Sequence, residues 1–137
     1  MPFDGTQLTP HLDAVAKLDK VIAFIDTPDK WCKQQLRNSR GQRCMLGAIA
    51  AAGAAANETV TNAIKLAIKD VVGPTRSYVK IEMFNDSPLT THADVMRALM
   101  RARELLMAGR PVAKIARQID RPQRRGVIAM LRSLVHA

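Results

Sequence analysis

The sequence predicts a mainly α-helical fold: a compact helical domain with a possible short β element and a C-terminal helix-turn-helix. Only five of the 137 residues are aromatic although 47% are hydrophobic, so Leu, Ile, Val, Met and Ala must fill the core. Most apolar residues recur every three or four positions, and a single stretch alternates as a strand would. A chain of this length can bury one core without cross-links.

The first helix is predicted over residues 10–26. Thr9 and Pro10 are typical of a helix start, because a hydroxyl can cap the first turn and proline lacks only an N–H that this turn does not need. Apolar residues then recur at helical spacing, at Leu12, Val15, Leu18, Val21, Ile22 and Ile25. The sequence Thr-Pro-Asp at residues 27–29 ends this helix.

Residues 30–43 are polar and basic around Trp31 and Leu36, and the sequence Asn-Ser-Arg-Gly at 38–41 indicates a turn. We expect this turn to join short extended pieces, which need not form strands. From Cys44 to Gly53 the chain is rich in small and apolar residues. Small side chains let a helix approach its neighbour closely, so this run predicts a buried helix.

A third helix is predicted from Asn57 or Thr59, either of which can cap it, to residue 72, where Gly73 and Pro74 end it. Its apolar residues are Ile64, Leu66, Ala67, Ile68 and Val71. Residues 78–84 alternate and predict one short strand, which needs a partner and could find it near Trp31. The sequence Asn-Asp-Ser-Pro at 85–88 then predicts a turn.

A long helix follows, and its start resembles a capping box in which Thr91 caps and Asp94 takes the role of glutamate. Gly109 ends it. Its apolar positions are Val95, Ala98, Leu99, Ala102, Leu105 and Leu106. Residues 1–108 therefore form a helical body.

Residues 109–137 read as a helix-turn-helix packed on this body. Pro111 suits the first turn of a short helix, and Asp120 with Gln123 can cap a second one. The two buried faces would consist of Val112, Ile115, Ala116 and Ile119, and of Val127, Leu131 and Leu134. Two short helices packed through these faces would make the motif.

Positive charge is concentrated in the same region. Residues 97–137 contain ten Lys and Arg against Glu104 and Asp120, a net +8 of the chain's +9, whereas the other 96 residues hold eleven cations and ten acids. A basic field on one small element attracts polyanions. We therefore expect a nucleic acid as partner, with DNA favoured and RNA open.

The start of the second helix is the part that enters the major groove in this class of protein. Gln can read adenine and Arg can read guanine, so Gln123 and either Arg124 or Arg125 are the candidates for base contacts. The others would bind phosphate. The predicted nucleic-acid-binding residues are Lys114, Arg117, Arg121, Gln123, Arg124, Arg125 and Arg132.

Two resemblances extend this interpretation. Residues 105–119, with Leu105, the Gly109-Arg110 pair and Val-Ala-x-Ile-Ala at 112–116, resemble the start of the helix-turn-helix motif of bacterial proteins, and the resemblance covers roughly residues 105–134. It departs in the turn, where Asp120 stands in place of the usual glycine. The resemblance implies a small transcriptional regulator of phage or mobile-element type that acts as a dimer.

The body resembles an uncharacterised bacterial and phage family with Trp, Cys-x-x-Gly-Ala and Trp-Asn-Asp signatures. The matching residues are Trp31, Cys44, Gly47, Ala48, Phe84 in place of tryptophan, Asn85, Asp86, Thr91 and Val95 to Ala98. The resemblance implies a fold and no chemistry. It supports the alternative function, a non-enzymatic protein whose body binds a host protein, a ribonucleoprotein complex or a small ligand.

Each of these features also has an alternative interpretation. The C-terminal cations could form a solvated face, or contact an acidic protein or a membrane surface, although this segment lacks interfacial aromatic residues. The basic stretch 30–43, near Trp31, could extend a nucleic-acid surface or stack a base, or it could be a solvated loop. Asn85 and Asp86 are more typical of a turn that bonds nearby backbone than of a ligand site.

No enzymatic activity is expected. Cys44 could form a nucleophilic set with His92 and Asp86, but a cysteine beside apolar residues is more often part of the core. Cys32 and Cys44 lack zinc-site spacing, and phosphate-binding glycine loops are absent from the sequence, so neither metal nor cofactor is expected. The N-terminus does not resemble a signal peptide and no apolar run could span a bilayer, which predicts a cytoplasmic protein with free thiols.

Overall fold

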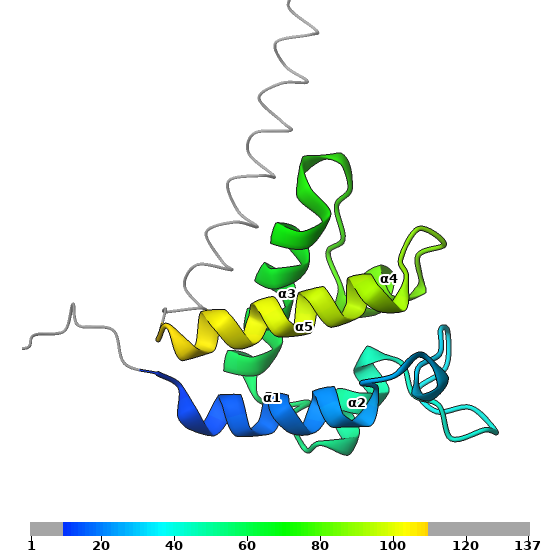
Figure 1. The fold of residues 1–137 in the computed structure, drawn as a ribbon, viewed down its shortest axis with the longest axis horizontal. Coiled ribbons are helices and arrows are strands. Elements are labelled where there is room, and N and C mark those ends of the chain that lie inside the picture. Colours follow the sequence, from blue (N-terminus) through cyan, green and yellow to red (C-terminus); the bar gives the residue numbers. More distant parts are fainter. Residues whose placement is uncertain (1–9, 110–137) are drawn as a thin grey trace, which may run out of the picture.

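The computed structural model describes residues 10–109, and these are mainly helical, as predicted (Figure 1). Two short 3₁₀ turns cover Pro28–Lys30 and Gly73–Thr75. The helices are α1 (Leu12–Phe24), α2 (Met45–Ala51), α3 (Glu58–Val72), α4 (Ile81–Asp86) and α5 (His92–Met107). None of the helices in residues 10–109 combines the length and the apolar character needed to cross a bilayer. The predicted helix-turn-helix begins at Gly109 and otherwise lies outside the described residues.

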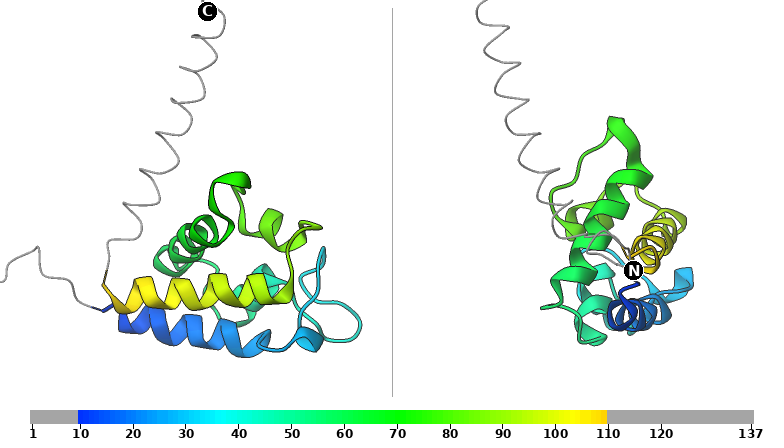
Figure 2. Two further views of the ribbon diagram at one scale, coloured as in Figure 1. Left: turned by 45° about the horizontal axis from the view of Figure 1, so that its top comes forward. Right: turned by 90° about the vertical axis from the view of Figure 1, so that its left-hand side faces the viewer.

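Helices α1 and α5 lie side by side, and α3 packs across α5 (Figures 1 and 2). The core between them is aliphatic, and Leu18, Ile64 and Leu99 are completely buried. Alanines at four-residue spacing, Ala63 and Ala67 on α3 and Ala98 and Ala102 on α5, are also fully buried. Their small side chains allow α3 and α5 to approach closely, since the distance between packed helices depends on the residues at the contact.

The helix ends follow the local signals. Thr91 and Asp94 form the predicted capping box of α5, and Asn57 caps α3 by accepting a hydrogen bond from the Val60 N–H at 3.1 Å. Gly73 ends α3 and Gly109 follows α5, both with a φ of +71°. Such a φ favours glycine because other side chains are strained there.

The start of α1 differs from its prediction. The helix begins at Leu12, with His11 as an N-cap that makes no side-chain capping bond, and Thr9 lies outside the described residues. The His11 N–H instead donates to the Leu106 carbonyl at 3.0 Å. This bond holds the first turn of α1 against the last turn of α5.

The predicted strand over 78–84 is wrong, because helix α4 begins at Ile81. Its buried residues, Ile81, Phe84 and Asn85, are spaced as one helical face, while Val79 and Met83 are exposed. Alternate residues of 78–84 therefore do not lie on one buried and one exposed face, as they would in a strand. Within residues 10–109 the only β pairing consists of isolated bridges, from Trp31 to Arg43 and from Arg37 to Arg43, so residues 30–43 contain short extended pieces and no strand.

Candidate functional site

All seven residues predicted to bind nucleic acid lie outside the described residues. They are Lys114, Arg117, Arg121, Gln123, Arg124, Arg125 and Arg132. Their roles therefore stay predictions. The described residues give related evidence on one point, which is how many cations of the body are paired with carboxylates.

The three arginines of α5 that contributed to the C-terminal charge are paired with carboxylates of the body. Arg103 binds Asp19 of α1 at 2.8 Å, and Arg101 binds both Asp70 of α3 at 3.0 Å and Glu104 at 3.1 Å. The hydrogen bonds to these carboxylates raise the pKa of both guanidinium groups. Arg97, the third, pairs with a carboxylate one turn earlier on α5. These arginines add little to an unpaired basic surface.

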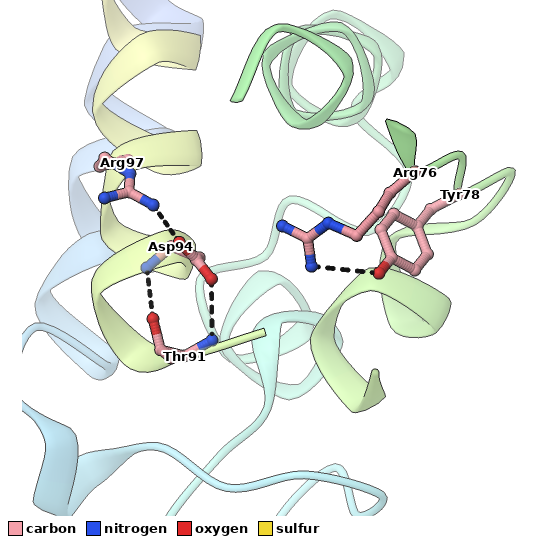
Figure 3. A network of polar contacts seen from close by, with 5 residues as sticks. All are labelled: Arg76, Tyr78, Thr91, Asp94 and Arg97. Carbon is pink, nitrogen blue, oxygen red and sulfur yellow. Dashed lines mark hydrogen bonds and ion pairs between the residues drawn. The ribbon is translucent and has the colours of Figure 1, made fainter. Parts of the chain in front are cut away.

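The partner of Arg97 is Asp94, which lies at the centre of the network in Figure 3. Asp94 also accepts a hydrogen bond from the Thr91 N–H at 3.0 Å, and this bond, with Arg97 nearby, holds the pKa of the carboxyl below its usual value. In the segment before α4, Arg76 points toward Asp94 and donates to the Tyr78 hydroxyl at 3.4 Å. The charge of Arg76 also lowers the pKa of Asp94, although no hydrogen bond or ion pair links the two side chains.

Residues of the predicted family signature converge around one buried side chain, Asn85. Its Oδ1 accepts hydrogen bonds from the Trp31 indole N–H at 2.7 Å and from the Met45 N–H at 3.0 Å. Its Nδ2 donates to the Cys32 carbonyl at 3.2 Å and to Asp86 at 2.9 Å. Asn85 is completely buried, and both donors and both acceptor positions are used.

This arrangement corrects the interpretation of residues 85–88 as a turn with local bonds. Asn85 and Asp86 are the last residues of α4, and their side chains bind segments that are 40 to 54 residues away in the sequence. Asp86 accepts a hydrogen bond from the Gln34 N–H at 2.7 Å, and Lys33 donates to the Ser87 carbonyl at 2.6 Å. The end of α4 therefore holds residues 31–34 in place.

Near the start of α2, Cys44 and Gly47 make a second set of contacts that positions residues 31–43. The Cys44 Sγ caps α2 by accepting a hydrogen bond from the Gly47 N–H at 3.3 Å. A Cβ atom at Gly47 would lie 1.9 Å from the Leu36 carbonyl oxygen, which is backbone and cannot rotate away. The Cys-x-x-Gly spacing thus caps a helix and lets the Leu36 backbone approach it.

Cys44, His92 and Asp86 make separate contacts, and no hydrogen bond joins any two of them. Cys44 is 5% exposed and caps α2, while the His92 Nε2 lies 2.8 Å from the Ile25 carbonyl oxygen. Burial raises the pKa of the other thiol, Cys32. Neither cysteine is in a disulfide, and residues 10–109 contain no group of three or more side chains suited to hold a metal ion.

Trp31 anchors the loop and offers little surface for stacking. Its ring lies 5.8 Å from that of His92, centroid to centroid, and the Lys33 ammonium is 5.7 Å from the ring centroid. Its indole N–H is bonded to Asn85. The suggestion that a base could stack on Trp31 is therefore not supported by its surroundings.

We call residues 32–43 the basic loop. Its tip is the turn predicted at 38–41, where Asn38 Oδ1 accepts hydrogen bonds from the N–H groups of Arg40 and Gln42, each at 3.0 Å. Gly41 has a φ of +79°, and its N–H donates to the Asn38 carbonyl at 3.0 Å. The loop is therefore held both at its tip and at its base.

The cations of this stretch differ in their surroundings. Lys30 pairs with Asp26 at 2.9 Å, and Arg43 lies over the Phe24 ring, 4.8 Å from its centroid. Lys33 is bonded to a carbonyl as described above. Arg37 and Arg40 are exposed, and neither has an ion pair among residues 10–109. The basic loop thus presents two unpaired guanidinium groups.

A family of unknown function, DUF6197, matches residues 9–105. The chain belongs to this family. The prediction of an uncharacterised family for the body is thereby confirmed, and the Trp31–Asn85 cluster and the basic loop lie inside the match. Residues 106–137 lie outside it, and so does most of the helix-turn-helix resemblance. Neither a curated protein nor a solved structure matches the chain.

Sequence reasoning did not anticipate the central role of Asn85. The available signal was the spacing of Ile81, Phe84 and Asn85, which places Asn85 on the apolar face of a short helix. A polar side chain on such a face needs buried partners.

Proposed function

We propose that this protein binds DNA, with residues 110–137 as the main contact. The observation that supports the proposal is the distribution of charge along the sequence, together with the ion pairs of the α5 arginines. Residues 110–137 contain seven Lys and Arg against Asp120, whereas residues 10–109 contain fourteen against ten acids, with the α5 arginines in ion pairs. A concentrated field of this kind attracts the DNA backbone and speeds association.

In this proposal Gln123 and one of Arg124 and Arg125 contact base edges, and the remaining cations bind phosphates. The protein would be a small transcriptional regulator of phage or mobile-element type. Proteins of the helix-turn-helix class commonly act as dimers on paired half-sites about one helical turn apart. The body would then supply the contact between two copies.

A second candidate function is binding of a protein, a ribonucleoprotein complex or a small ligand through the body. The observation that favours it is the basic loop, whose residues 34–37, 39 and 40 are exposed while the buried side chain of Asn85 fixes its start. Loops held in a defined conformation by a rigid scaffold are common locations of binding residues.

The test of DNA binding is the salt dependence of duplex affinity, measured by fluorescence anisotropy with the full chain. R124A/R125A is compared with R101A/R103A, which removes the same charge from two arginines that are already paired. Each lost phosphate contact should make the slope of log K against log salt concentration shallower by about 0.9. We expect R124A/R125A to lose affinity and up to about 1.8 of slope, and R101A/R103A to retain both.

Equal behaviour of the two double variants would show that only net charge matters and would overturn a defined C-terminal contact. An absence of duplex binding by the wild-type chain at low salt would overturn DNA binding altogether and leave the body-based function as the better candidate.

A further inference from the structure

We propose that the exposed part of the basic loop, residues 34–40, is a second DNA contact in which Arg37 and Arg40 bind backbone phosphates. This inference rests on the proposed DNA-binding function and assigns a second surface to it. It concerns the body of the protein and not the C-terminal segment.

Residues 30–43 contain five cations and no acid, so this stretch has a positive charge of its own. Three acids belong to the segments that flank or hold the loop: Asp26 pairs with Lys30, Asp86 accepts from the Gln34 N–H, and Asp29 is exposed without an ion pair to Arg37 or Arg40. Arg37 and Arg40 are exposed and have no carboxylate partner among residues 10–109, unlike the arginines of α5. An unpaired guanidinium can bind phosphate with two hydrogen bonds and displaces no protein partner when it does so.

Contacts with the body hold this loop in one conformation, which a solvated loop does not require. Gln34 has a φ of +70°, which is sparsely populated for residues other than glycine. Its N–H is bonded to Asp86, and Gly47 admits the Leu36 backbone. Strained positions of this kind persist only when surrounding contacts enforce them, and they are common at binding sites. The entropy of ordering the loop has been lost before any partner binds.

The side chains of the loop favour a duplex backbone over other partners. Gln34, Gln35 and Ser39 are exposed and can donate hydrogen bonds to phosphate or sugar oxygens. Leu36 is the only large apolar side chain exposed there, which is too few for the apolar centre of a protein interface. Trp31 is covered by His92 and Lys33, so the loop lacks an open stacking surface for a single strand.

The position of the loop suits a second contact on the same duplex. The basic loop lies at the end of the body where α5 begins, and the described chain ends at Gly109, beyond the other end of α5 (Figures 1 and 2). A helix of 16 residues is about 24 Å long, which corresponds to roughly seven base pairs. The two contacts would therefore bind phosphates on separate parts of one site.

The experiment compares R37A/R40A with R101A/R103A and the wild-type chain on a duplex of about 25 base pairs, again with anisotropy at several salt concentrations. We expect R37A/R40A to make the slope of log K against log salt shallower by about 1.8, because two phosphate contacts are lost, and R101A/R103A to leave it unchanged. Circular dichroism and the fluorescence of Trp31 check that each variant keeps the fold.

A second variant tests the role of the fixed conformation. Asn38→Ala keeps every charge of the loop and removes the acceptor for the Arg40 and Gln42 N–H groups. We expect it to weaken duplex binding several-fold with a smaller change of slope than R37A/R40A causes, because the cations are kept but no longer held in place.

The outcomes separate the two proposals. If R124A/R125A weakens binding while R37A/R40A binds as the wild type does, the loop proposal is overturned and the C-terminal contact stands, and the loop would then face another class of partner, such as an acidic protein. If only R37A/R40A weakens binding, the loop is the contact and the C-terminal proposal fails. If the wild-type chain does not bind duplex DNA, both are overturned.

Discussion

Replacing Asn85 by alanine is the most direct test of how the loop is held. The change leaves the Met45 N–H, which is completely buried, without its acceptor and also removes the acceptor of the half-buried Trp31 indole. A buried donor left unsatisfied costs about 1–3 kcal/mol, and a half-buried one costs less because water can reach it. Together with the small cavity, we expect a loss of about 3 kcal/mol in the free energy of unfolding.

Urea denaturation measures this loss. With a slope of about 2 kcal/mol/M, a loss of about 3 kcal/mol lowers the midpoint by about 1.5 M. Trp31 is the only tryptophan of the chain and donates directly to Asn85, so its fluorescence reports on the loop while circular dichroism reports on the helices. If the loop detaches first in Asn85→Ala, the fluorescence transition will precede the helical one.

Two further variants define the cause. Asn85→Asp keeps the volume but replaces the group that donates to the Cys32 carbonyl and to Asp86, so it should lose stability to a similar extent without a cavity. Asn62 lies half-buried on α3 and its side chain makes no hydrogen bond to residues 10–109, so Asn62→Ala should change stability by less than about 0.5 kcal/mol. A loss below about 1 kcal/mol in Asn85→Ala, or one equal to that of Asn62→Ala, would refute the reasoning.

Three other predictions follow from the described contacts. Gly47→Ala should lower the free energy of unfolding, measured by urea denaturation, by about 2 kcal/mol, because the Cβ of alanine meets the Leu36 backbone. Alanine favours helices more than glycine does, so a gain in stability would contradict this contact. The folded state holds the Asp94 pKa below its ordinary value of 3.8, so the ionised carboxylate stabilises the fold above that pH, and this stabilisation is lost as the pH falls through the lower folded value. The difference in free energy of unfolding between wild type and Asp94→Asn should therefore be constant near neutral pH and shrink below about pH 4. A difference that does not depend on pH would count against this role of Asp94. When the native protein is alkylated, mass spectrometry should find the half-buried Cys32 modified before the buried Cys44, with both reactions slow, and urea should make both thiols reactive. Faster labelling of Cys44 than of Cys32 in the native protein would contradict the burial of Cys44.

Features that depend on neighbouring residues could be read from the sequence. The capping box at Thr91 and Asp94, the Asn57 cap, the glycines that follow α3 and α5, and the turn at 38–41 all occur where they were predicted. Each of these involves groups within about one turn of the chain, so residue type and spacing are sufficient. The mainly helical fold follows for the same reason, since the apolar spacing of α1, α3 and α5 is local.

The environment of the signature residues depended on contacts that local pattern does not contain. The bonds of Asn85 reach 40 and 54 residues back along the chain, and the role of Gly47 depends on the position of Leu36. The segment 78–84 alternates as a strand does, but burial of Ile81 and Phe84 against the core selects a helix instead. Likewise, the arginines of α5 count as excess charge in the sequence, and only the folded chain brings Asp19 and Asp70 to them. Packing decides which polar groups find partners, because it alone determines which distant residues come within bonding distance.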